Sequence, residues 1–189
     1  MKLIEICTLA AELGKDIDLT GCFYGPVHGY NHVEKNPYKY YYFLAGFCQA
    51  IEAKTVLEFG THFGGSISAI RKAVPEAKLV TVDPVTNNTL DESITRIEGF
   101  SNDPNLYPKL KEHFPDGVDL IFVDSEHTFK CTSKTLELCR TLKPKYLIFD
   151  DIRLNSGMSL FWSKVRDEKF DCTALSGREN NCGFGVVKL

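Results

Sequence analysis

The chain has 189 residues and carries 22 Lys and Arg against 25 Asp and Glu, which gives a formal net charge of −3. That charge excludes the usual basic nucleic-acid-binding domain, whose pI exceeds about 9. Hydrophobic residues make up 43% and charged residues 25% of the chain, a balance that excludes disorder as the main state. At this length we expect one domain over residues 1–189.

The cysteines indicate a reducing compartment. There are seven, an odd number, and no CxxC pair occurs, so neither a disulfide framework nor a zinc finger is predicted. Glu5 and Glu12 near the N-terminus are atypical of a signal peptide. No apolar run approaches the roughly 20 residues of a membrane span. We therefore predict a cytoplasmic protein without a membrane segment.

The N-terminal part is predicted to be mainly helical. Apolar residues recur at helical spacing through residues 2–14, so a helix with a buried face should end near Gly14. Residues 15–36 are rich in Gly, Asn, His and aromatic side chains without a period, and we interpret them as a loop or lid. Pro37 then opens a second helix that runs to about Ala53, because proline is tolerated in a first helical turn.

From residue 54 onward, short apolar runs alternate with stretches of helical period. Continuous apolar strands that alternate with helices indicate a parallel sheet covered on both faces. The predicted strands span residues 55–59, 79–82, 120–123 and 146–149, and the helices between them span residues 66–74, 106–114 and 128–142.

The remaining elements complete a seven-stranded sheet. A weaker strand is predicted at about residues 93–98, and a helix at about residues 156–167 precedes the tail. The tail holds two apolar runs, residues 170–175 and 183–188, separated by a polar turn, which is typical of an antiparallel hairpin. The predicted fold class is α/β, a doubly wound sheet that ends in this hairpin.

A glycine-bearing turn follows the first strand. Gly60 permits a tight turn and the close approach of a ligand, Gly64 leaves the next helix N-terminus uncluttered, and Ser66 can cap it. Asp83 ends the second strand about 20 residues further on, where a carboxylate can accept both ribose hydroxyls of a nucleoside. The alternative is that Asp83 caps the following helix and the glycines only shape a turn.

Two other kinds of nucleotide site are not predicted. His62 stands two residues after Gly60, where a dinucleotide-binding turn needs glycine because the pyrophosphate lies against bare backbone. The chain also has no GxxxxGK[ST] segment, which excludes a phosphate-loop NTPase.

Carboxylates also end the buried strands near residues 123 and 149. Asp124, Asp150 and Asp151 are expected at the same rim as Asp83, because the carboxyl ends of parallel strands meet there. Crowded carboxylates repel one another unless a cation lies among them, and their hard oxygens suit Mg²⁺ or Mn²⁺. In the alternative, Asp150 or Asp151 caps a helix or binds backbone amides, and no metal is held.

His127 lies three residues after Asp124 and is a candidate general base, since its ordinary pKa is near 6.5. A lone histidine is also often structural, and that interpretation stays open here. His28, His32 and His62 are weaker candidates for the same role.

Together these residues resemble the class I S-adenosylmethionine-dependent methyltransferases over residues 54–189. The resemblance implies a Rossmann-like seven-stranded sheet of order 3-2-1-4-5-7-6, with residues 54–189 as the cofactor-binding core and residues 1–53 as a helical cap or lid. Asp83 matches the ribose-binding acid of that superfamily. The resemblance further implies that S-adenosylmethionine is contacted from the first motif, by Glu58, Gly60, Thr61, His62, Gly64 and Ser66, and by Asp124.

Two groups within the class are similar to this chain. Catechol O-methyltransferase-like enzymes have residues matching Ser101 and Asn102 beside the adenine, and their metal ligands match Asp124, Asp150 and Asp151. Their Asp-Asn pair is Asp-Asp here, and His127 replaces their catalytic lysine. Macrocin-type sugar O-methyltransferases and their cephalosporin hydroxylase-like relatives have both of these features, which implies that His127 removes a hydroxyl proton.

The sequence therefore predicts a metal-dependent O-methyltransferase for a small polyhydroxylated substrate, with a sugar preferred over a catechol. The alternatives are hydroxylase-like oxidation of a small molecule and a non-catalytic cofactor-binding protein. Neither nucleic acid nor a membrane is an expected partner, and a homo-oligomer is left open. An aromatic cluster could cover the site or simply pack a helix, and consists of Phe23, Tyr24, Tyr30, Tyr38, Tyr40, Tyr41 and Tyr42.

Overall fold

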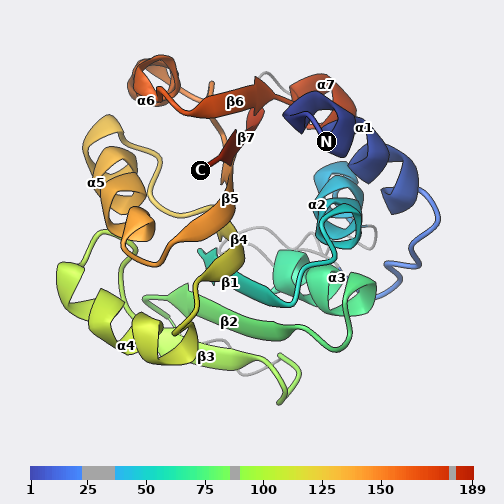
Figure 1. The fold of residues 1–189 in the computed structure, drawn as a ribbon, viewed down its shortest axis with the longest axis horizontal. Coiled ribbons are helices and arrows are strands. Elements are labelled where there is room, and N and C mark those ends of the chain that lie inside the picture. The colour runs from blue at the N-terminus through green and yellow to red at the C-terminus, as the bar shows by residue number, and fades with distance from the viewer. Residues whose placement is uncertain (23–36, 86–89, 179–181) are drawn as a thin grey trace, which may run out of the picture.

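The computed structural model describes residues 1–22, 37–85, 90–178 and 182–189. A seven-stranded sheet of order β3-β2-β1-β4-β5-β7-β6 runs through the middle of the molecule (Figure 1). The first five strands are mutually parallel, and β7 is antiparallel to both of its neighbours. The strands are β1 (Thr55–Phe59), β2 (Lys78–Asp83), β3 (Thr95–Glu98), β4 (Val118–Val123), β5 (Pro144–Asp150), β6 (Glu168–Asp171) and β7 (Phe184–Lys188).

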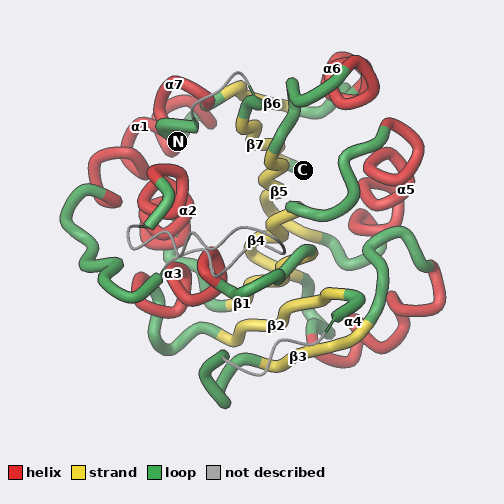
Figure 2. The backbone as a smooth tube through the Cα atoms, turned by 180° about the vertical axis from the view of Figure 1, so that it is seen from behind, coloured by secondary structure: helices red, strands yellow, loops and turns green. Residues whose placement is uncertain are grey.

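Helices cover both faces of this sheet, as the front and back views show (Figures 1 and 2). One face carries α1 (Leu3–Gly14), α2 (Lys39–Ala50), α3 (Gly65–Ala73) and the short α7 (Thr173–Ser176). The opposite face carries α4 (Tyr107–His113), α5 (Phe129–Arg140) and α6 (Ser156–Lys164), and the 3-10 turn η1 (Pro104–Leu106) leads into α4.

Two hydrophobic cores result, one on each side of the sheet. Successive residues of one strand alternate between them: Val56 belongs to the core under α1, α2 and α3, and Leu57 to the core under α4, α5 and α6. Because both faces are covered, most side chains that point to either face are apolar, which explains the apolar runs in the sequence. The predicted fold class and strand order are confirmed.

The tail differs from the prediction in one element. The strand expected at residues 170–175 lies earlier, at β6, and its second half forms α7 instead. The side chain of Asp171 accepts hydrogen bonds from the backbone N–H of Thr173 at 3.1 Å and from its hydroxyl at 2.6 Å. This local capping bends the chain out of the sheet and starts a helical turn.

The N-terminal helices are built into one of the cores. Tyr40, Tyr41 and Phe43 of α2 are buried against the sheet, which is the helix-packing alternative for the aromatic cluster. Phe23, Tyr24 and Tyr30 of that cluster, with His28 and His32, lie outside the described residues. The division into a cap and a core stays a prediction. Among the described residues no helix is long and apolar enough to cross a membrane.

Candidate functional site

The turn after β1 brings three strand ends together. Gly60 has φ +93°, and a Cβ placed there would lie 1.7 Å from the carbonyl oxygen of Asp124, so only glycine fits. Its N–H donates to the carbonyl of Val82 at 2.9 Å, while the N–H of Asp124 donates to the carbonyl of Phe59 at 2.8 Å. The ends of β1, β2 and β4 are therefore held side by side.

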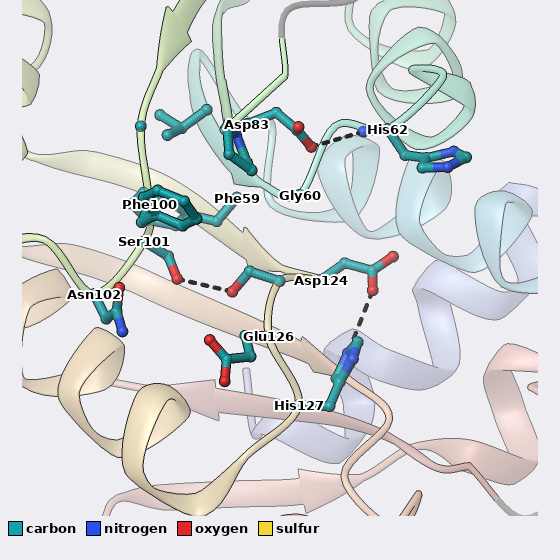
Figure 3. A pocket seen from close by; sticks show the side chains of 14 residues that line it. Phe59, Gly60, His62, Asp83, Phe100, Ser101, Asn102, Asp124, Glu126 and His127 are labelled. Atoms are coloured by element: carbon teal, nitrogen blue, oxygen red, sulfur yellow. Dashed lines mark hydrogen bonds and ion pairs between the residues drawn. The ribbon is translucent and has the colours of Figure 1, made fainter. Parts of the chain in front are cut away.

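A pocket of about 370 Å³ opens at these strand ends (Figure 3). A volume of this size is typical of a small-molecule site, and its position at the carboxyl ends of parallel strands is the usual one. The lining comes from the segments that follow four strands. It consists of Phe59, Gly60, His62, Val82, Asp83, Pro84, Gly99, Phe100, Ser101, Asn102, Asp124, Ser125, Glu126 and His127.

Six of the residues proposed to bind the cofactor line this pocket: Gly60, His62, Asp83, Ser101, Asn102 and Asp124. The other four, Glu58, Thr61, Gly64 and Ser66, do not. Glu58 is fully buried and accepts hydrogen bonds from the hydroxyls of Ser66 at 2.5 Å and Thr81 at 2.7 Å. The hydroxyl of Thr81 in turn is hydrogen-bonded to that of Thr61. These side chains support the turn from behind.

Asp83 has two tasks at once. One oxygen accepts the backbone N–H of His62 at 3.0 Å and the other that of Val85 at 2.9 Å, so the carboxylate helps to shape the turn after β1 and the segment after β2. It also lines the pocket (Figure 3), and each carboxylate oxygen retains a second lone pair for a ligand.

The wall after β3 contains a residue that the sequence prediction missed. Phe100 is 61% exposed although it is large and apolar, and it lies in the pocket lining between Gly99 and Ser101. An exposed aromatic ring in a pocket is a surface for a flat ligand. The hydroxyl of Ser101 is bound to the hydroxyls of Ser125 at 2.9 Å and Thr135 at 3.0 Å.

His127 points from the loop after β4 toward Asp124 (Figure 3). Its Nε2 atom lies 3.5 Å from Asp124 Oδ1 and 3.7 Å from Asp151 Oδ2. Burial lowers the pKa of His127, but the two carboxylates outweigh burial, so the pKa is raised above its ordinary value. The structure thus places a histidine, beside two carboxylates that favour its protonated form, at the rim of the pocket.

Asp150 and Asp151 meet a partner that the sequence did not indicate. The guanidinium of Arg178, which follows α7, lies 2.9 Å from Asp150 Oδ2 and 2.8 Å from Asp151 Oδ1. Asp151 has φ +57°, and this backbone conformation ends β5. Arg178 belongs to no spacing motif in the sequence, so no local signal could connect it to Asp151, which is 27 positions away.

The three predicted metal ligands face other side chains of the protein, and the metal site stays a prediction. Asp150 and Asp151 bind Arg178, while Asp124 faces the pocket and His127. Within the described ranges, no three His, Cys, Asp or Glu side chains are placed to hold a metal ion together. The chemistry of the oxygen donors suits Mg²⁺, but their positions fit the guanidinium instead.

We compared the chain with known protein families, sequences and structures. No family model matches the chain. An uncharacterized protein, R132 of Acanthamoeba polyphaga mimivirus, is 26% identical over an alignment of 113 residues, and the match covers 51% of this chain and 51% of that protein.

Among solved structures, the O-methyltransferase TomG from Streptomyces achromogenes, in complex with S-adenosylmethionine, is 17% identical. It matches over 98% of this chain and 89% of its own, with a TM-score of 0.58. An O-methyltransferase from Bacillus cereus with S-adenosylhomocysteine is 16% identical over 98% and 91% of the two chains, with a TM-score of 0.59.

The MycE methyltransferase of the mycinamycin pathway, with Mg and S-adenosylhomocysteine, is 18% identical. It matches over 85% of this chain but 50% of its own, with a TM-score of 0.57. The chain thus spans about half the length of MycE and of the mimivirus protein. These similarities establish that the chain has the fold of the class I methyltransferases.

Proposed function

We propose that the protein is an S-adenosylmethionine-dependent O-methyltransferase that acts on a hydroxyl group of a small molecule. The observation that carries the proposal is the position of His127 at the rim of a pocket that Gly60, Asp83 and Asp124 line at the carboxyl ends of β1, β2 and β4. The fold supports it, because proteins of this fold named above are O-methyltransferases with S-adenosylmethionine or S-adenosylhomocysteine bound.

The residues of the pocket suggest a division of labour for cofactor binding. Asp83 is proposed to accept the ribose hydroxyls, Phe100 to lie against the adenine, and Gly60 to leave room for the amino-acid portion of the cofactor. When bound, the cofactor supplies a sulfonium methyl group, whose carbon–sulfur bond breaks as the bond to the substrate oxygen forms.

His127 is proposed to be the catalytic residue. The neutral imidazole accepts the hydroxyl proton while the substrate oxygen attacks the methyl carbon. Asp124 and Asp151, whose carboxylates lie within 4 Å of Nε2, then stabilise the imidazolium that forms. Positioning supplies most of the remaining rate enhancement, since a methyl sulfonium is already reactive.

A polyhydroxylated small molecule, with a sugar group preferred over a catechol, is the proposed substrate class. It is supported by the resemblance of Asp124, His127, Asp150 and Asp151 to the macrocin-type pattern, and by the fold shared with MycE, whose solved complexes include mycinamycin VI. Mg²⁺ is found with MycE. The proposed mechanism routes no step through a metal, because the guanidinium of Arg178 already binds Asp150 and Asp151.

Cofactor binding is the first test. We expect S-adenosylhomocysteine to bind the purified protein in a calorimetric titration, and Asp83→Ala to weaken binding by about tenfold or more, since it removes a charge-assisted hydrogen-bond acceptor. Asp116 is an exposed turn residue before β4, at the opposite end of the strands. Asp116→Ala is therefore the matched control and should bind S-adenosylhomocysteine like the wild type. Absence of binding to the wild type would refute the proposal.

The role of His127 is tested separately. His127→Asn should lower methyl transfer to sugar or catechol acceptors by about 10²–10⁴-fold, because a general base is lost, and should leave S-adenosylhomocysteine affinity nearly unchanged. His113→Asn at the end of α4 is the control. Oxidised rather than methylated product would favour the hydroxylase-like alternative, and binding without any turnover would favour a non-catalytic cofactor-binding protein.

A further inference from the structure

Asp150 and Asp151 are buried carboxylates whose four oxygens all face donors of the chain itself. Asp150 Oδ1 accepts the N–H of Asp151 at 2.9 Å, and its Oδ2 lies 2.9 Å from Arg178 Nη2. Asp151 Oδ1 accepts from the same Nη2 at 2.8 Å, and its Oδ2 lies 3.7 Å from His127 Nε2. The side chain of Asp150 is 1% exposed and that of Asp151 is 11% exposed, so water contributes little to their solvation.

Arg178 is held in place from a third side as well. Its guanidinium carbon lies 4.7 Å from the centre of the Tyr40 ring, a cation–π contact with a buried residue of α2. Gly177, with φ +66°, ends α7 beside Lys39, and a side chain there would be strained. The guanidinium therefore joins α2, the end of β5 and the segment after α7.

The charge requires a cation at this point. Two adjacent carboxylates without water or a partner are strongly unfavourable, so either a proton, a metal ion or a basic side chain has to compensate them. A guanidinium keeps its charge at any physiological pH, and its fork of N–H donors matches carboxylate oxygens.

We infer that Arg178 is the resident cation of the Asp150–Asp151 pair, so that a divalent metal ion binds these aspartates only by displacing the guanidinium. The chain itself then places a positive charge where a metal ion would otherwise lie. The wild-type protein should accordingly bind divalent cations weakly, and the aspartates should become a metal site once Arg178 is removed.

Titration with Mn²⁺ alone, followed by calorimetry, tests this inference. Arg178→Ala should bind Mn²⁺ at least about tenfold more tightly than the wild type, because a positive charge is removed beside the oxygens. The double variant Arg178→Ala, Asp150→Asn should lose the gain, which locates the new site. Arg140→Ala breaks an ion pair with Asp167, remote from the pocket, and should leave Mn²⁺ affinity unchanged.

A wild type that binds Mn²⁺ as tightly as Arg178→Ala would overturn the inference. Should Arg178→Ala fail to fold, Arg178→Lys keeps a single charge but loses the fork, and is expected to bind Mn²⁺ more tightly than the wild type by a smaller factor. Folding of Arg178→Ala only when Mn²⁺ is added would also support a shared cation position, whereas unchanged Mn²⁺ affinity in Arg178→Lys would contradict it.

A second readout rests on the proposed function. Methyl transfer by the wild type should persist in EDTA, while Arg178→Ala should depend on added Mn²⁺. The Mn²⁺ titration needs no methyl transfer, so failure of the proposed function leaves that measurement valid.

Discussion

Glu58 is fully buried on β1, where burial raises the pKa of its carboxyl from 4.5 to about 8 against the opposing effect of the Ser66 and Thr81 hydroxyls. The nearby carboxylates of Asp124 and Asp83 raise the pKa further. The folded protein therefore retains a proton that the unfolded chain loses near pH 4.5. The free energy of unfolding must therefore fall as the pH rises from about 4.5 to about 8. The contribution of Glu58 to stability is greatest below about pH 4.5.

Glu58→Gln should remove this pH dependence. An amide keeps one acceptor and one donor for the two hydroxyls and does not ionise, so the variant should gain on the order of a few kcal/mol over the wild type between pH 5 and pH 8. Urea unfolding at several pH values measures it. The exposed Glu76→Gln is the control, and a Glu58→Gln variant that followed the wild-type pH profile would show that Glu58 ionises normally.

At the scale of single elements, the turn after β1 depends on Gly60 for two separate reasons. Its φ of +93° is unfavourable for other residues, and any side chain would collide with the backbone of Asp124. Gly21 has a similar φ of +86°, but, its chain neighbours apart, no atom of the described residues lies within 4 Å of the position that a Cβ would take there. Alanine substitutions at Gly60 and Gly21 therefore distinguish the cost of backbone strain from the cost of steric collision.

Gly60→Ala should lower the free energy of unfolding by at least about 3 kcal/mol, because β1 and β4 must move apart at the site. Gly21→Ala should cost only about 1 kcal/mol, the cost of the left-handed backbone conformation alone. Thermal and urea unfolding of the two variants compare these effects. Equal losses would mean that the contact between the Gly60 turn and Asp124 is looser than the structure indicates.

At the scale of the whole molecule, Phe184 ties the last strand to the N-terminal helices. Its ring lies 5.5 Å from that of Tyr40 and 5.9 Å from those of Phe43 and Phe122, centre to centre. The contacts join β7, α2 and β4, so the core on this face connects segments from both ends of the described chain.

Phe184→Ala should therefore destabilise the protein by about 3–5 kcal/mol, the usual cost of a large cavity in a packed core. Phe100→Ala is the matched control: its ring is 61% exposed, and its loss should change stability by less than about 0.5 kcal/mol. Urea unfolding checks both, and a small effect at Phe184 would argue against a single continuous core on that face.

The amino-acid pattern was enough to predict the sheet and the rim on which the site lies. Strands covered on both faces require unbroken apolar runs, so β1, β2, β4 and β5 are visible in the pattern, and the carboxyl ends of parallel strands necessarily meet. Asp83, Asp124 and His127 could therefore be grouped from the sequence pattern alone, and all three line the pocket.

The division between side chains that face the pocket and side chains that support it could be seen only in the folded molecule. Glu58 is buried in the interior, whereas Phe100 is exposed and lines the pocket. The residues next to each of them in the sequence did not indicate which side chain would face the pocket. The pairing of Arg178 with Asp150 and Asp151 joins the segment after α7 to the end of β5. Such a contact follows no local period, since it arises when the folded sheet and helices bring distant side chains within hydrogen-bond distance.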